Sequence, residues 1–569
     1  MGRWTRMLLI LLTIFFALSM RAHATTYYIA ASGSDSNSGT VNTSPWLHAP
    51  GMPNCTANCA SKTPQPGDSF IFRGGDAWHR SASTSDSSDV PMGGEWNWTW
   101  SGSGGGSTCN YPSVTSTCIY IGADTAWYNS SVCGSSFCRP QVEFDNPIWA
   151  NSTHQDTSHA GFVTACSYDD YNTTAVYLDA SDIQFDNFNM WGKCWATPPV
   201  YGGDAEISRN GNYIAVTKAY IHGWTETYNP LPDGGSNQMD DAEMITDAAL
   251  GTGTDTIASS VFDGSDSHCT GVNNCTGGPV QGNDADSTYF YGNVCRYITN
   301  CIASPHFLKS VHDNLFEDVY ESYDPSEHGN VVEQDGALPG VPITFYNNVV
   351  RHVNTGIILD LYSASGGLYI FNNTFFDIQG ISGGNCVMIQ NDNQSQTRSM
   401  YFTNNTVDNA TNVCAIRAQP NSGQGWNGTI YLQNNHLIGI TSLSAMESCG
   451  SGSTCTWTDN GNEVFQTESA ANSQGYTSEN DYQPTSANGA TYQKGGNLSL
   501  QCATYSVDLA LCSGSTGSVT DLAASGILPV LDILQPALRG AAWDVGAYQY
   551  SGDSSNEPVA PLGLTAAVQ

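Results

Sequence analysis

Carboxylates and histidines in the middle of the chain are the residue types that acid–base chemistry requires. An acidic run lies at positions 240–243, and five of the 12 histidines lie between positions 268 and 352. Histidine and carboxylate side chains are the usual general acids and bases of enzymes. We therefore predict a catalytic group in which the histidine is the proton partner. Its members are Glu243, Asp284, His328, Glu333 and Asp360. The alternative is a turn residue for each aspartate and a structural histidine at position 328.

Further residues around this group are candidates for binding substrate or a cation. We predict that four basic residues contact the substrate, namely His306, His312, Arg296 and Arg351. Asp240 and Asp241, next to Glu243, are the best candidates for a Ca²⁺ site, because Ca²⁺ takes oxygen ligands. No segment follows the EF-hand or nonapeptide calcium pattern, so calcium is a candidate cofactor and no cofactor is certain.

A repeat in the chain indicates which elements must position these residues. The unit is apolar-x-apolar-x-Asn-Asn-x-apolar, with clear copies at 343–350, 368–376, 400–407 and 430–437. Short alternating segments that recur about every 20 to 40 residues are typical of the coils of a β-solenoid. The apolar anchors of successive coils are Phe185, Val216, Ile257, Phe290, Val311, Phe345, Phe371, Phe402 and Leu432.

Residues at equal offsets from these anchors should stack about 4.8 Å apart. The residues two positions after the anchors form one such column, which should provide turns with left-handed backbone and an asparagine ladder. It reads Asn187, Lys218, Ser259, Gly292, Asp313, Asn347, Asn373, Asn404 and Asn434. Six residues on, the column reads Trp191, His222, Asp263, Arg296, Glu317, Arg351, Asp377, Asp408 and Ile438. The sign of the side-chain charge alternates along this column from Asp263 to Asp377. The alternative role for Arg296 and Arg351 is therefore a charge ladder between coils.

The repeat and both ends of the chain resemble the right-handed parallel β-helix superfamily, the pectate-lyase-like fold. The segments that carry the resemblance at the ends are 27–40, 66–75 and 543–548. The resemblance implies an all-β fold, a single-stranded right-handed parallel β-helix with an N-terminal cap. We expect the cap and first coils at 25–180, further coils and a C-terminal cap at 181–550, and a flexible tail at 551–569.

The same resemblance implies a polysaccharide hydrolase or lyase that works in a groove along the solenoid. Polygalacturonases of this fold carry an Asn-Thr-Asp segment and an Arg-Ile-Lys segment, and both are missing here, so their mechanism is not transferred. Carboxylates one coil apart would be about 5 Å apart, near the retaining spacing, and two coils apart about 9.6 Å, near the inverting limit. The alternative is a non-catalytic, extracellular glycan-binding module, which would scatter the acidic residues and present a flat aromatic strip instead.

The start of the chain and its cysteines indicate export. The first 24 residues have a basic start, an apolar run and the pattern Ala22-His23-Ala24, as in a cleaved signal peptide. An exported protein with 18 cysteines is expected to form disulfides, so we predict a secreted, periplasmic or cell-surface protein. We predict nine sequential pairs: Cys55 with Cys59, Cys109 with Cys118, Cys133 with Cys138, Cys166 with Cys194, Cys269 with Cys275, Cys295 with Cys301, Cys386 with Cys414, Cys449 with Cys455, and Cys502 with Cys512.

Charge excludes several classes of partner. The formal net charge of −35 disfavours nucleic acid and anionic membranes, which need a basic surface. No later stretch is long and apolar enough to span a bilayer, and we expect a monomer. Trp78, Trp96, Trp98 and Trp100 could stack on sugar rings, or could cover the open first coil.

Overall fold

The structure is a computed structural model, and the parts of the chain that it describes are numerous short ranges. They are residues 24–80, 90–104, 117–144, 174–192, 194–195, 204–222, 225–226, 242–247, 255–263, 281–284, 288–298, 301–303, 310–319, 330–334, 342–353, 357–362, 367–378, 385–390, 398–408, 414–418, 426–500, 513–515, 536–539 and 542–550.

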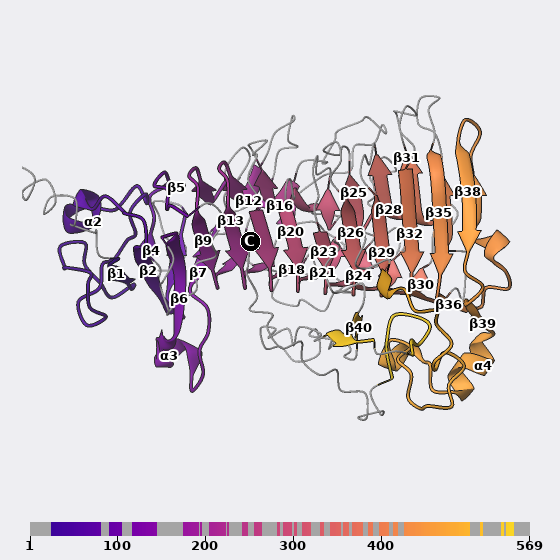
Figure 1. The fold of residues 1–569 in the computed structure, drawn as a ribbon. Helices are drawn as coiled ribbons and strands as arrows, with labels where there is room; N and C mark the ends of the chain where they lie inside the picture. Colours follow the sequence, from indigo (N-terminus) through magenta and orange to yellow (C-terminus); the bar gives the residue numbers. More distant parts are fainter. Residues whose placement is uncertain are drawn as a thin grey trace, which may run out of the picture.

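Three long sheets run side by side along the molecule, from the indigo N-terminal end to the orange end in Figure 1. Sheet 1 contains β1 (Thr26–Ile29), β2 (Ser69–Gly74), β6 (Ile119–Tyr128), β9 (Ile183–Asp186), β13 (Ile214–Thr217), β17 (Asp255–Ala258), β20 (Thr288–Tyr291), β23 (Ser310–His312), β26 (Ile343–Tyr346), β29 (Leu368–Phe371), β32 (Arg398–Thr403), β35 (Asn427–Gln433) and β38 (Thr454–Asp459).

Sheet 2 follows sheet 1 in each coil. It contains β4 (Val90–Pro91), β3 (Ala77–His79), β7 (Gln141–Glu143), β10 (Asn189–Trp191), β14 (Tyr220–His222), β18 (Val261–Asp263), β21 (Val294–Ile298), β24 (Leu315–Val319), β27 (Val349–Val353), β30 (Thr374–Ile378), β33 (Thr406–Asp408), β36 (His436–Ile438) and β39 (Val464–Gln466).

Sheet 3 completes the coil. It contains β5 (Trp96–Trp98), β8 (Val176–Leu178), β12 (Asp204–Arg209), β16 (Ala242–Asp247), β19 (Gln281–Asp284), β22 (Ile302–Ala303), β25 (Val332–Gln334), β28 (Ile357–Tyr362), β31 (Asn385–Gln390), β34 (Ala415–Ala418) and β37 (Glu447–Cys449).

The remaining elements are small. Two further strand pairs are β11 (Cys194–Trp195) with β15 (Thr225–Glu226), and β40 (Ser513–Ser515) with β41 (Pro536–Leu538). The helices are α2 (Ala57–Ser61), α3 (Ser130–Cys133), α4 (Glu468–Ser473) and the 3₁₀ turns η1 (Leu443–Ala445) and η2 (Ser478–Asn480).

Strand pairing confirms the predicted parallel β-helix. Each strand of a sheet pairs in parallel with the strand one coil away, for example β9 with β13 and β13 with β17. Parallel neighbours need a crossover connection, and here the rest of the coil provides it. The chain is therefore one all-β solenoid with a continuous core along its axis.

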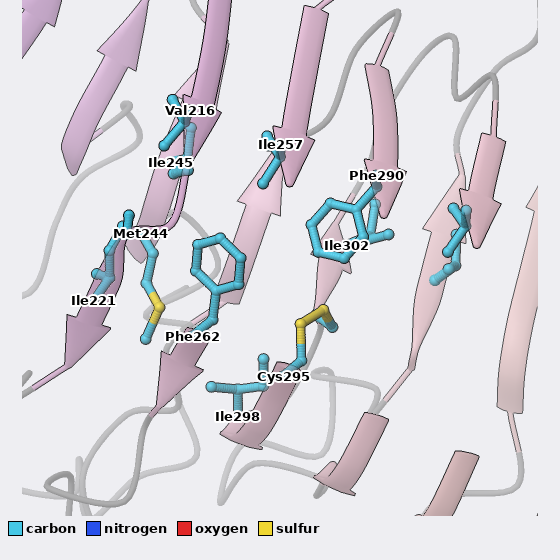
Figure 2. Packing of buried hydrophobic residues seen from close by; sticks show 14 of the residues in the cluster. Val216, Ile221, Met244, Ile245, Ile257, Phe262, Phe290, Cys295, Ile298 and Ile302 are labelled. Carbon is cyan, nitrogen blue, oxygen red and sulfur yellow. A yellow bond between two sulfur atoms is a disulfide. The ribbon is translucent and has the colours of Figure 1, made fainter. Parts of the chain in front are cut away.

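The core is built from the apolar anchors of the repeat. Val216, Ile257 and Phe290 are register partners on successive coils and have no exposed surface. Figure 2 shows them facing residues of the other two sheets, among them Phe262 and Ile302. Side chains of a strand alternate between its two faces, so each core row is flanked by rows on the outer face.

One anchor was predicted wrongly. Phe345 pairs with Ile370, and not with Phe371. Leu368 to Phe371 is a run of four apolar residues, so alternation alone does not show which of them face the core. The corresponding turn residue is Asn372, with φ of 56°, instead of Asn373.

The turn between sheets 1 and 2 explains the paired asparagines. The first residue of each pair has left-handed backbone, as predicted, with φ of 54° at both Asn347 and Asn404. The ladder is formed by the residue after it, which corrects our assignment of the ladder to the first column. Asn348 Oδ1 accepts from the backbone N–H of Asn314 at 3.0 Å, and Asn348 Nδ2 donates to Val311 O at 3.1 Å. The buried ladder contains Asn293, Asn314, Asn348, Asn373, Asn405 and Asn435.

The N-terminal cap is closed by tryptophans. Trp78, Trp96 and Trp98 have no exposed surface, and Trp98 packs edge-on against Phe70 at 5.0 Å between ring centroids. Trp100 is partly buried against the same core. These rings cover the first coils, so the structure favours the cap role over sugar stacking.

Five of the nine predicted disulfides are formed within the described residues. They are Cys55–Cys59, Cys133–Cys138, Cys295–Cys301, Cys386–Cys414 and Cys449–Cys455. Cys118 is also disulfide-bonded.

The other four predicted pairs reach beyond the part of the chain that the structure describes. The cysteines that lie outside the described residues are Cys109, Cys166, Cys269, Cys275, Cys502 and Cys512. The pairing of Cys269 with Cys275, that of Cys502 with Cys512, and that of Cys166 with Cys194 therefore stay predictions, as does Cys109 as the partner of Cys118.

Among the described helices, none has the length and apolar character needed to cross a membrane.

Candidate functional site

One register row of sheet 3 brings three of the five predicted catalytic positions together. Glu333 on β25 pairs with Asp360 on β28, as predicted. Asn283 pairs with Ile302, and Ile302 pairs with Val332. The row next to this core row therefore reads Asp284, Ala303, Glu333 and Asp360, and it belongs to the outer face of the sheet.

The spacing within this row suits acid–base chemistry on a sugar. Glu333 and Asp360 are one coil apart, which is about 4.8 Å along the sheet. Asp284 and Glu333 are two coils apart, about 9.6 Å, and Ala303 occupies the position between them.

Glu333 is held by a buried amide. Asn330 has no exposed surface, and its Nδ2 donates to Glu333 Oε2 at 2.8 Å. The backbone N–H of Cys301 donates to Asn330 O at 3.3 Å, which links Asn330 to the preceding coil. Asn330, itself fully buried, therefore orients one oxygen of Glu333.

Two disulfides brace the same sheet. Cys295–Cys301 joins β21 to the residue just before β22, which carries Ala303. Cys386–Cys414 joins two adjacent coils at β31 and β34. All four cysteines are buried in the core of the solenoid, so the two disulfides crosslink the core next to β22 and between β31 and β34.

Glu243 lies away from this row. It is on β16 and pairs with Gln281, three residues before Asp284. Three residues along a strand correspond to about 10 Å. The row position on β16 is Thr246 instead. His328, His306, Asp240 and Asp241 lie outside the described residues.

The same row contains a residue that the sequence analysis did not select. Asp360 pairs with Met388, and Met388 pairs with Arg417 on β34. Arg417 is half-buried and lies two coils beyond Asp360. The coil alignment would have found it if the columns had been extended from sheets 1 and 2 to sheet 3.

Arg296 and Arg351 lie on sheet 2 and form the charge ladder that was the alternative for them. Arg296 Nε donates to Asp263 Oδ2 at 2.8 Å, and Arg351 Nη2 donates to Glu317 Oε2 at 2.7 Å. Asp263 and Glu317 are 1% and 5% exposed. Burial opposes the charge of Arg296, but Asp263 more than compensates and raises its pKa. Both guanidinium groups therefore stabilise buried carboxylates between coils.

The predicted ladder is wrong at its last position. Arg351 pairs with Phe376, and not with Asp377, because the anchor of that coil is Ile370. Asp377 has left-handed backbone and lies beside His352 instead, with 3.5 Å between Asp377 Oδ2 and His352 Nε2. Asp318 Oδ1 lies 3.7 Å from His352 Nδ1 on the other side, and its hydrogen bond raises the pKa of His352.

His312 lies on the outer face of sheet 1, apart from the carboxylate row. Its Nδ1 is 2.6 Å from Asp313 Oδ2, and its ring stacks between Tyr291 and Tyr346 at 5.0 and 4.6 Å between centroids. The sequence analysis did not anticipate Asp313 as its partner. An imidazole held in this way is positioned by its neighbours, and its predicted contact with substrate stays a prediction.

The aromatic residues of sheet 1 stack on one another. Tyr369, Tyr401 and Tyr431 are register partners with nearly parallel rings, 5.3 and 4.6 Å apart between centroids. Tyr369 and Tyr401 are only 7% and 4% exposed. Their ring faces are occupied by each other, so these ladders hold coils together.

No group of three metal-binding side chains is found among the described residues. The predicted Ca²⁺ ligands Asp240 and Asp241 lie outside that part of the chain. The described residues therefore do not define a cation site.

Comparison with known proteins gives structural likeness only. No protein-family model matches the chain, and no curated protein matches it. Pectate lyase Pel9A is 14% identical, with a TM-score of 0.39, over 94% of this chain and 98% of that one.

Two further solved structures are similar. The GH136 lacto-N-biosidase from Eubacterium ramulus is 12% identical, with a TM-score of 0.38, over 81% of this chain and 71% of that one. A rhamnogalacturonan lyase is 11% identical, with a TM-score of 0.32, over 78% of this chain and 88% of that one. At these values the likeness carries no argument about activity, and the fold rests on the strand pairing described above.

Proposed function

We propose that this protein is an exported polysaccharide hydrolase whose active site is the outer row of sheet 3. One observation carries the proposal, the register that places Asp284, Ala303, Glu333 and Asp360 on successive coils. Hydrolysis of a glycosidic bond needs two carboxyl groups at a defined separation, and this row supplies them.

The pair that fits best is Asp284 with Glu333. Their separation of about 9.6 Å is at the upper end of the inverting range, where a water molecule fits between the base and the sugar. Ala303 is the residue between them in the row. We assign Glu333 as the general acid and Asp284 as the general base that activates water.

Asp360 offers a second pairing for Glu333. The two positions are register partners on adjacent coils, about 4.8 Å apart along the sheet, which is near the retaining separation. In that arrangement Asp360 would be the nucleophile and Glu333 would keep its role as the acid.

The two arginines of sheet 2 that we predicted to contact substrate do not supply the base that a lyase needs. A lyase needs a basic residue to remove a proton next to the acidic group of the sugar, and Arg296 and Arg351 are engaged with Asp263 and Glu317. Arg417 is the basic residue of the row, and we assign it to binding at the end of the groove.

The test is turnover of a polysaccharide panel by the purified protein, followed by the anomeric configuration of the first product. We expect new reducing ends with inverted configuration. A retained configuration would move the assignment to Glu333 and Asp360, and binding without turnover would replace the hydrolase with a glycan-binding module.

A further inference from the structure

The residue that follows the predicted leader is held by a buried carboxylate. The backbone N–H of Thr25 donates to Asp68 Oδ1 at 3.0 Å, and Thr25 O accepts from the N–H of Ser69 at 2.9 Å. Strand β1 begins at the next residue, Thr26, which pairs with Ser69. Thr25 is thus fixed at both its nitrogen and its oxygen before the first coil begins.

Asp68 is built into the cap. It is 1% exposed, and its Oδ2 accepts from the N–H of Gln65 at 2.9 Å, while its own N–H donates to Gln65 O at 2.9 Å. Gly67 in this turn has φ of 89°, which favours glycine. The turn therefore holds one oxygen of Asp68 and directs the other to Thr25.

The two oxygens of Asp68 face different partners. Lys62 Nζ lies 2.9 Å from Asp68 Oδ2, on the opposite oxygen from Thr25. An amide N–H at Thr25 is a neutral donor. A free amino terminus at the same nitrogen would supply a positive charge and a charge-assisted hydrogen bond, about twice as strong as a neutral one.

We propose that Thr25 is the first residue of the mature protein and that Asp68 binds its α-ammonium group. The sequence Ala22-His23-Ala24 provides the small-x-small pattern for cleavage, and Ala24 is exposed while Thr25 is half-buried. The proposal rests on the expected leader and is independent of the catalytic row. Cleavage converts an ordinary hydrogen bond into an ion pair without moving the nitrogen.

The first test is the N-terminus of the protein exported with its own leader, read by mass spectrometry. We expect Thr25 as the first residue. Any other first residue in the exported protein overturns the proposal.

The second test measures the ammonium group itself, by the rate at which an acylating reagent labels the N-terminus at pH 7.5. Only the uncharged amine reacts, and a free α-amine has a pKa of about 8. We expect labelling of the Thr25 amine to be about tenfold slower than in a protein that begins one residue earlier, at Ala24. The Ala24 form keeps Asp68 and the whole cap, so it is a matched control.

Substitution at Asp68 separates pairing from simple obstruction. Asp68→Asn keeps the shape and removes the charge, and we expect about tenfold faster labelling of Thr25. Equal rates in the wild type and in Asp68→Asn, or equal rates for the Thr25 and Ala24 forms, contradict the receptor role. Because the Ala24 form needs no cap mutation, this test holds even if Asp68→Asn does not fold.

Discussion

At the residue scale, the small side chain at position 303 is as important to the proposed chemistry as the carboxylates. Ala303 lies between Asp284 and Glu333 in the outer row of sheet 3. A larger residue there would fill the space that the attacking water and the sugar need.

Ala303→Val is therefore expected to lower kcat/KM by about 10²-fold, because misplacing a substrate by about 1 Å can cost this much. The melting temperature should change little, since the row is on the outer face. Ser399→Val, on the outer face of sheet 1, is the control and should keep full activity. Unchanged turnover by Ala303→Val is the result that would remove Asp284 from the proposed pair.

Arg351 has a structural role, because its charge is used to stabilise buried carboxylates. Its guanidinium pairs with Glu317, which is 5% exposed, and Nη1 lies 3.8 Å from Asp481. Removing one partner of a buried pair leaves an uncompensated charge, while replacing both by apolar residues can be nearly neutral.

We accordingly expect Arg351→Met to lose about 3–5 kcal/mol of unfolding free energy, and Arg351→Met with Glu317→Leu to recover most of it. Denaturant unfolding of the two single variants and the double variant gives the coupling energy. Additive losses in the double variant would contradict a buried pair. Loss of turnover in a fully folded double variant would instead indicate a catalytic role.

At the scale of the element, two adjacent asparagines in the turn between sheets 1 and 2 have different structural roles. Asn347 provides left-handed backbone, whereas the side chain of Asn348 forms hydrogen bonds with the coils on both sides of it. The two positions therefore respond differently to the same substitution.

Asn347→Gly keeps the backbone conformation and removes one hydrogen bond, from Asn347 Nδ2 to Asp313 Oδ1 at 3.2 Å, so it should cost about 1 kcal/mol of unfolding free energy. Asn348→Gly removes the amide and leaves buried backbone groups unpaired, at about 1–3 kcal/mol for each group. Thermal unfolding of the two variants measures the difference. Equal losses would show that the ladder contributes nothing beyond the turn.

The apolar pattern predicts the solenoid because each coil repeats one core row, and Val216, Ile257 and Phe290 are in the predicted register. The prediction is wrong at Phe371, because a run of apolar residues there removes the alternation. This one-residue error in the anchor also led us to assign Asp377, instead of Phe376, to the charge ladder. Glu333 and Asp360 were aligned correctly because the glycines before them mark equivalent positions. The partners of His312 and Glu333 were not predicted, since the sequence does not show which neighbouring amide or carboxylate a side chain contacts.

At the scale of the whole molecule, stability should depend on pH through carboxyl groups buried under the C-terminal segment. Burial raises the pKa of Asp408 to about 6; Glu468 and Asp377 add to this, while the hydroxyl of Tyr482, which donates to Asp408, opposes it. Burial likewise raises the pKa of Asp481 to about 6, against the effect of Arg351 and with that of Glu317.

Both groups bind a proton more tightly in the folded state than in the unfolded state. Their stabilising contribution is therefore complete below pH about 4 and is lost as the pH rises through about 6. The net charge of −35 acts in the same direction, because self-repulsion weakens as carboxylates are protonated. We expect a higher melting temperature at pH 5 than at pH 7.5, with the difference reduced in Asp408→Asn. Asp179→Asn, at an exposed position, is the control, and a melting temperature that rises from pH 5 to pH 7.5 would contradict this account.

The most direct measurement of the central claim is polysaccharide turnover by the wild type and by Glu333→Gln, followed by both reducing ends and absorbance near 235 nm. The row of sheet 3 predicts new reducing ends without the absorbance of an unsaturated sugar. It also predicts a rate at least about 10²-fold lower in Glu333→Gln, which loses the general acid. The variant should keep the melting temperature of the wild type, and Glu479→Gln should keep its rate. A rise in absorbance, or an undiminished rate in Glu333→Gln, would contradict a hydrolase built on the carboxylates of sheet 3.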